Sequence, residues 1–84
     1  MSRWNPTSPV TFHPGVHLRA EMNARGWNTM YLAMRTGVEL RTWKRILQGE
    51  APITASAAGH LARAFGTSEQ FWINLQRSWD ESER

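Results

Sequence analysis

The sequence predicts an all-α domain of five short helices. Apolar residues recur at the i, i+3, i+4 spacing of one helix face in successive segments, and a glycine closes four of these segments. No alternation of apolar and polar residues is long enough to build a sheet. The 84 residues allow one domain at most, which buries roughly 60% of the surface of its unfolded chain, so a catalytic cleft is hard to fit.

Composition divides the chain into an arm, a folded domain and a tail. Residues 1–12 hold prolines and hydroxyl side chains and are expected to form a flexible N-terminal arm. Residues 13–80 are expected to form the folded domain. Residues 81–84 are mostly charged and are expected to form a frayed C-terminal tail.

The first helix is expected to start at Pro14 and to end before Gly26. Proline fits the first turn of a helix, where its missing N–H leaves no hydrogen bond unmade. Leu18 and Met22 lie four residues apart and are the expected inward side chains.

The segment from Asn28 to Gly49 reads as two short helices joined by a tight turn. Asn28 is the expected N-cap of the first, and Gly37 closes it because glycine accepts the left-handed backbone of a helix stop. The second helix starts near Glu39 or Leu40. Its apolar stripe is formed by Trp43, Ile46 and Leu47. This pattern is a helix-turn-helix, which places its second helix in the major groove of DNA.

The outer face of that second helix is basic. It presents Arg41, Thr42, Lys44 and Arg45. The whole chain has a net charge of +3, from 10 basic and 7 acidic side chains. The segment from Arg19 to Arg45 alone holds six basic and two acidic residues, so the positive charge gathers on the half that would read DNA.

Two further helices complete the expected fold. Thr54 is the expected N-cap of the fourth, and Thr67 or Ser68 that of the fifth. The apolar face of the fourth is formed by Ala58, Leu61, Ala62 and Phe65. The apolar side of the fifth is formed by Phe71, Trp72, Leu75 and Trp79.

The aromatic side chains are expected mainly in the core, because a small domain gains much of its burial from such rings. The expected core set is Trp27, Trp43, Phe65, Phe71 and Trp72. An exposed aromatic stripe on a terminal helix is also a candidate partner surface, and Trp79 lies near the chain end. We therefore expect the dimer interface on the fifth helix, at Phe71, Leu75 and Trp79.

Catalysis and metal binding are not expected. The chain has no cysteine, which excludes a disulfide framework and a thiolate metal site and fits a reducing cytoplasm. It has no glycine-rich phosphate loop or nucleophile-elbow motif, so neither an enzyme nor a cofactor is expected. His13, His17 and Glu21 lie four residues apart, but His13 precedes the helix proper, so the three need not converge on a metal. No apolar run approaches the ~20 residues of a membrane span.

Several short motifs resemble a known family. HPG at 13–15, LR at 18–19 and GWN at 26–28 resemble the opening of HigA-type antitoxins, which are VapI/HigA-like addiction-module antidotes of the Xre/Cro helix-turn-helix class. The run FGTSEQFWINLQ at 65–76 resembles that family more specifically. Together the motifs cover about residues 13–80.

The resemblance implies a compact lambda-repressor-like fold and a cytoplasmic homodimer. Such a protein represses transcription by binding a palindromic operator in double-stranded DNA, and it neutralises a RelE/HigB-like ribonuclease toxin by direct binding. The residues implied to contact DNA lie at the starts of the two motif helices and along the second helix: Asn28, Thr29, Glu39, Leu40, Arg41, Thr42, Lys44, Arg45 and Gln48.

By the family's pattern, these residues divide their roles. Leu40, Arg41 and Arg45 face base edges, and a bidentate arginine–guanine pair is good for ~1–3 kcal/mol of discrimination. Polar side chains near the phosphates position the protein without reading sequence. These are Thr29, Thr42, Lys44 and Gln48.

The chain also departs from the family's pattern. Glu39 stands where a hydroxyl cap is common, and Thr29 replaces a longer glutamine. Two alternatives remain open: a module that binds a protein partner with little affinity for DNA, and an orphan or phage repressor of the Xre family without a toxin.

Overall fold

The structure is a computed structural model that describes residues 11–83. Within this range it has five α-helices: α1 (Pro14–Arg25), α2 (Thr29–Thr36), α3 (Leu40–Leu47), α4 (Ala55–Phe65) and α5 (Glu69–Ser82). The predicted all-α class and its five helices are confirmed. Most of the arm expected at residues 1–12 lies outside the described range. No helix in that range is both long and apolar enough to cross a membrane.

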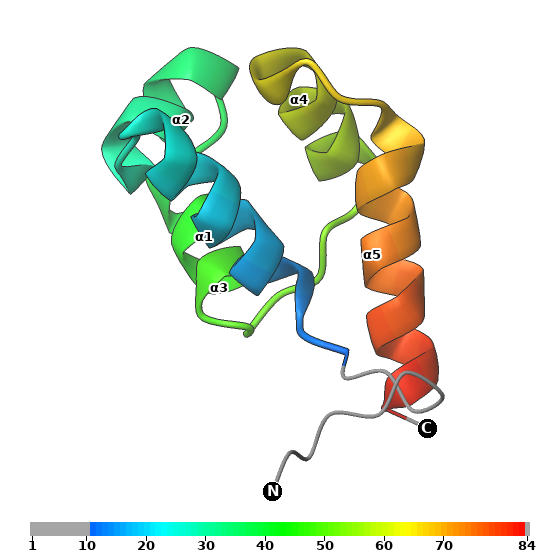
Figure 1. Cartoon of the computed structure of the whole chain (residues 1–84). Coiled ribbons are helices and arrows are strands. Elements are labelled where there is room, and N and C mark those ends of the chain that lie inside the picture. The colour runs from blue at the N-terminus through cyan, green and yellow to red at the C-terminus, as the bar shows by residue number, and fades with distance from the viewer. Residues whose placement is uncertain (1–10, 84) are drawn as a thin grey trace, which may run out of the picture.

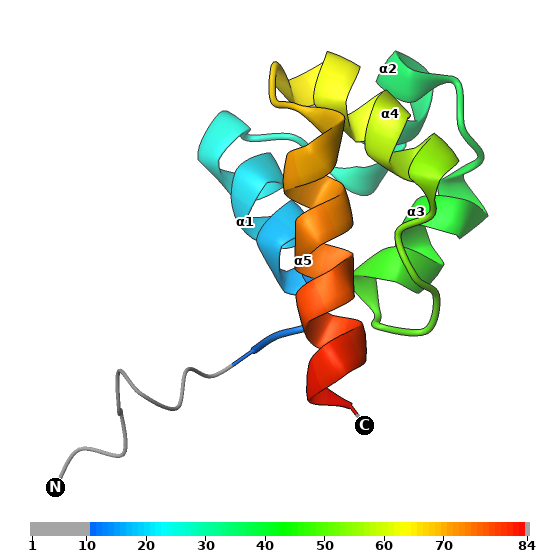
Figure 2. The same ribbon diagram turned by 90° about the vertical axis from the view of Figure 1, so that its right-hand side faces the viewer.

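The helices pack around one core (Figures 1 and 2). In Figure 1, α1, α2 and α3 lie on one side and α4 and α5 on the other. Contacts between α2 and α4, and between α1 and α5, join the two sides. The largest fully buried side chains come from both: Trp43, Trp72, Leu18, Met22, Leu32, Ile46 and Leu61.

Local caps explain where the helices begin. Asn28, Thr54 and Ser68 each accept a hydrogen bond from the backbone N–H three residues on, at 2.8, 3.1 and 3.1 Å. Each satisfies one of the N–H groups that a helix start leaves without an intrahelical partner. Of the two candidates for the last cap, Ser68 takes the position, and the Thr67 hydroxyl instead accepts from the Trp72 indole N–H at 2.8 Å.

The last helix differs from the expectation. Phe71, expected in the core, is 39% exposed, whereas Gln76 is only 9% exposed. The inward face of α5, which packs against α4 and α1, therefore includes Trp72 and Gln76, one turn apart. The helix also continues through Ser82, two residues past the expected end of the folded domain, and the Ser82 hydroxyl donates to the Trp79 carbonyl at 2.8 Å.

Candidate nucleic-acid interface

Helix α3 buries one face and exposes the other. Trp43 and Ile46 are 0% and 1% exposed. The turn before the helix is made by Gly37, whose φ of 74° lies in the left-handed region that favours glycine. Glu39 is the N-cap residue, but its side chain makes no capping hydrogen bond. The buried stripe therefore fixes which side chains of this helix face solvent.

The solvent face of α3 is cationic. Arg41, Lys44 and Arg45 are exposed there, and none of them has an ion-pair partner among residues 11–83. The one ion pair in that range joins Arg25 to Glu21 at 2.6 Å. These three cations are consequently available to phosphate oxygens and base edges. Leu40 and Thr42 are half-buried beside them, and Gln48 is exposed just after the helix.

A hollow of about 190 Å³ lies between α3 and the loop that leads into α4. Arg41, Thr42 and Arg45 line it on the helix side, and Pro52 is part of the loop side. The Arg45 Nη2 donates to the carbonyl of Glu50 at 3.5 Å, a long bond that restrains the guanidinium only weakly.

The start of α2 is a separate contact point. The Asn28 Oδ1 accepts the Tyr31 N–H at 2.8 Å, so its carbonyl is committed to the cap and only its amide N–H groups remain for a phosphate. Thr29 is half-buried as the first residue of the helix. The eight residues of α2 place Thr29 about 12 Å along the axis from the turn.

A model of the helix-turn-helix domain family matches residues 15–70. The chain is 34% identical to the solved addiction module antidote protein of the HigA family from Coxiella burnetii, over 86% of this chain and 79% of that one, with a TM-score of 0.81. The chain belongs to the HigA-type helix-turn-helix family. A Pseudomonas aeruginosa antitoxin HigA, solved with the higBA promoter, is 33% identical over 88% of this chain and 82% of its own, with a TM-score of 0.85.

A curated relative of this HigA-type chain is longer than the chain itself. Virulence-associated protein I of Dichelobacter nodosus is 35% identical over 69 residues, which are 81% of this chain and 64% of that protein. The chain thus spans less than two thirds of that relative's length.

The three residues expected at the dimer interface of this HigA-type chain differ in their surroundings. Leu75 is half-buried against the core. Trp79 is also half-buried, with its ring edge-on to the His13 ring at a centroid distance of 5.6 Å. Phe71 packs edge-on against Trp72 at 5.0 Å. Phe71 has the largest exposed fraction of the three.

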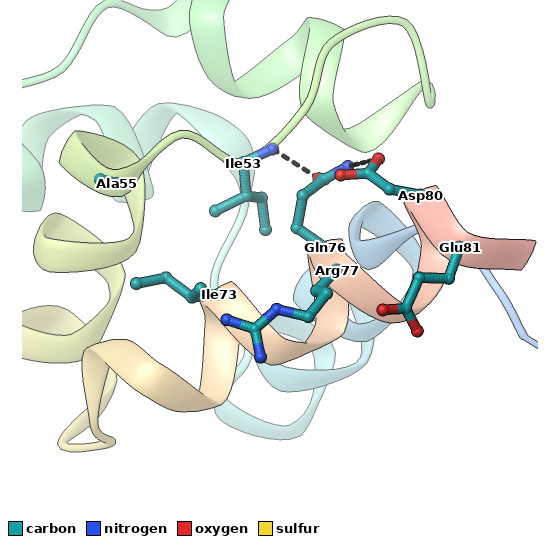
Figure 3. Close-up of a pocket in the computed structure, with 7 residues that line it drawn as sticks. All are labelled: Ile53, Ala55, Ile73, Gln76, Arg77, Asp80 and Glu81. Atoms are coloured by element: carbon teal, nitrogen blue, oxygen red, sulfur yellow. Dashed lines mark hydrogen bonds between the residues drawn. The ribbon is translucent and has the colours of Figure 1, made fainter. Parts of the chain in front are cut away.

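Two residues that shape the site were missed by sequence reasoning. The Thr36 hydroxyl accepts the Trp43 indole N–H at 3.0 Å, and the available signal was that a buried indole N–H needs a partner. Gln76 accepts the Ile53 backbone N–H and donates to the Asp80 carboxylate, both at 2.8 Å (Figure 3). It fastens the loop beside α3 to α5. Its signal was its position one helical turn after Trp72, inside the apolar side of the helix.

Proposed function

We propose that this HigA-type protein is a sequence-specific DNA-binding repressor that reads its operator with α3. One observation carries the proposal: the exposed face of α3 presents Arg41, Lys44 and Arg45 without acidic partners in the described range. The opposite face is anchored in the core by Trp43 and Ile46, so the cations stand on a fixed helix. Cations that neutralise phosphates release bound counterions and so supply much of the affinity for DNA.

The proposed contacts follow from the chemistry of each side chain. Arg41 and Arg45 read base edges, since a guanidinium matches the guanine O6 and N7 acceptors. Leu40 contacts a thymine methyl group. The remaining polar residues that carry a hydrogen-bond donor hold phosphates or the backbone near them: Asn28, Thr29, Thr42, Lys44 and Gln48. For Asn28 this contact is made through its amide, and Glu39 favours the N-terminal end of the α3 dipole.

The repressor acts as a homodimer in this proposal. One domain carries one recognition helix, and two half-sites one helical turn apart require two such helices about 34 Å apart. A two-fold dimer then reads a palindrome, because each copy meets an identical half-site. The proposed dimer interface is Phe71, Leu75 and Trp79 on α5.

We further propose that the protein is the antitoxin of a type II toxin–antitoxin operon and acts in the cytoplasm. It would neutralise a RelE/HigB-like ribonuclease toxin by direct binding. Family membership supports this, since the Coxiella burnetii relative is described as an addiction module antidote. Co-expression with a short toxin-like reading frame beside the gene should relieve growth arrest and yield a co-purifying complex. Without such a frame, or without relief, the protein is an orphan repressor.

A fluorescence-anisotropy titration tests the DNA-binding part. The probes are palindromes from upstream of the gene and a scrambled duplex of equal length, each at two salt concentrations. Preferential binding to one palindrome, weakening as salt rises, is the expected result. Equal binding to all duplexes, or no binding to any of them, would contradict the proposed repressor function. The remaining alternative would be a module that binds only a protein partner.

A further inference from the structure

A single hydroxyl joins all three parts of the helix-turn-helix. Thr36 is the last residue of α2, and its Oγ1 donates to the Leu32 carbonyl at 2.7 Å. The same oxygen accepts the backbone N–H of Val38 in the turn at 3.3 Å and the indole N–H of Trp43 in α3 at 3.0 Å. A hydroxyl has one hydrogen and two lone pairs, so its hydrogen-bonding capacity is fully used.

The bond to α3 differs in kind from the packing around it. Trp43 and Ile46 anchor α3 through apolar contacts, which are not directional. A hydrogen bond between the Trp43 indole and the Thr36 hydroxyl weakens steeply away from its preferred angle and distance. Among the orientations that apolar packing alone would tolerate, this bond therefore favours one.

Small rotations of α3 matter for reading DNA. A turn of about 10° about the helix axis moves a side-chain atom ~6 Å from that axis by about 1 Å. A bidentate arginine contact to guanine needs both donors within hydrogen-bond distance at once. Contacts to phosphate tolerate such a shift better, because they depend mainly on charge.

We infer that Thr36 is a positioning residue for base recognition: through the Trp43 indole N–H it sets the orientation in which α3 presents Arg41 and Arg45. The inference rests on the proposed DNA-binding function. Thr36 itself touches no base, and its effect passes through Trp43. Removing the hydroxyl should therefore lower specificity more than it lowers affinity for DNA of any sequence.

The test compares Thr36→Val, which keeps the shape and removes the hydroxyl, with Thr36→Ser, which keeps the hydroxyl. Affinities of the full chain for the operator and for a scrambled duplex are measured well below the unfolding temperature. Thr36→Val should lower the ratio of the two affinities about tenfold with less than a twofold change on scrambled DNA. Thr36→Ser should keep the wild-type ratio. In ¹⁵N-labelled protein, the Trp43 indole N–H of Thr36→Val should exchange faster with solvent.

A second variant separates positioning from stability. Thr36→Val leaves the buried indole N–H of Trp43 without its partner, whereas Thr36→Val combined with Trp43→Phe removes that indole donor as well. If Thr36→Val fails to fold, Trp43→Phe alone reports the loss of the same bond. Every variant without the bond should show the lowered ratio, whatever its thermal midpoint. A wild-type ratio in any folded variant without the bond would overturn the inference.

The two proposals fail in different ways. A wild-type protein that shows no operator preference removes the repressor function and this role of Thr36 with it. A wild-type preference that Thr36→Val retains overturns only the positioning role.

Discussion

Gly15 is buried where the start of α1 meets the end of α3. A Cβ at this position would overlap the carbonyl oxygen of Ile46, a backbone atom that cannot turn aside. Gly59 in α4 is also buried, but its added Cβ would meet the Arg63 guanidinium at 3.6 Å, an ordinary van der Waals distance. Substitution by alanine should therefore change the free energy of unfolding in opposite directions at the two glycines.

Gly15→Ala should lower the free energy of unfolding by about 1–3 kcal/mol, because the overlap forces α1 away from α3. Gly59→Ala should raise it by about 0.5–1 kcal/mol, because alanine is the better helix former and has room. Urea unfolding followed by circular dichroism measures both. A Gly15→Ala variant as stable as the wild type would contradict this account of the α1–α3 contact.

Gln76 holds the loop before α4 through its hydrogen bond with the Ile53 N–H (Figure 3). Gln76→Leu leaves the Ile53 N–H, at a residue only 4% exposed, without its acceptor. The expected cost is about 1–3 kcal/mol of unfolding free energy, with faster hydrogen exchange at the Ile53 amide. Gln70→Leu is the matched control, since Gln70 bonds to Asn74 on the exposed side of the same helix. Unchanged protection at Ile53 would show that the loop is held by other contacts.

At the scale of the helices, α3 depends on its neighbours for its structure. Eight residues are too few for a stable isolated helix in water, so most of its stability comes from the packing of its buried stripe. The cationic face is consequently presented only when the core is formed. Losses of DNA binding in α3 variants should be compared at equal fractions of folded protein.

Helix starts and stops could be predicted from the sequence because their causes are local. Asn28 and Thr54 cap with side chains three residues from the N–H groups that they satisfy. The exposure of Phe71 and the burial of Gln76 could not be placed in this way. They depend on where α1 and α4 meet α5, which the spacing within one helix does not determine. The Thr36–Trp43 hydrogen bond joins α2 to α3, so it could not be predicted from the spacing within one helix either.

The two kinds of contact proposed for α3 should separate experimentally. Arg41→Ala should lower operator affinity about tenfold while leaving scrambled DNA nearly unaffected, because it removes a base contact. Lys44→Ala should weaken binding to both duplexes alike, because it removes a phosphate contact. It should also reduce the steepness with which log affinity falls with log salt concentration by about one. Arg77→Ala, at an exposed position on α5, is the charge-matched control. Equal losses on both duplexes for Arg41→Ala would refute its base-reading role.

At the scale of the whole molecule, the proposed reading of a palindrome depends on the proposed homodimer. Each domain carries a single α3, and a palindromic operator is read tightly only when both recognition helices bind together. On α5, Phe71 belongs to the proposed interface; it is 39% exposed, and its ring packs edge-on against Trp72. Dimerisation and operator affinity should therefore be lost together.

Phe71→Glu should dissociate the dimer, because an unpaired carboxylate at an apolar interface loses its hydration without gaining a partner. The domain should still fold, since Phe71 is 39% exposed and the new charge can reach water. Sedimentation equilibrium should show a monomer. The affinity for a full palindrome should fall towards the affinity for a single half-site. The affinity for the single half-site should stay as in the wild type. Gln70→Glu makes the same change in charge at an exposed site one residue away and should remain dimeric. A dimer that persists in Phe71→Glu would contradict the placement of the interface at Phe71.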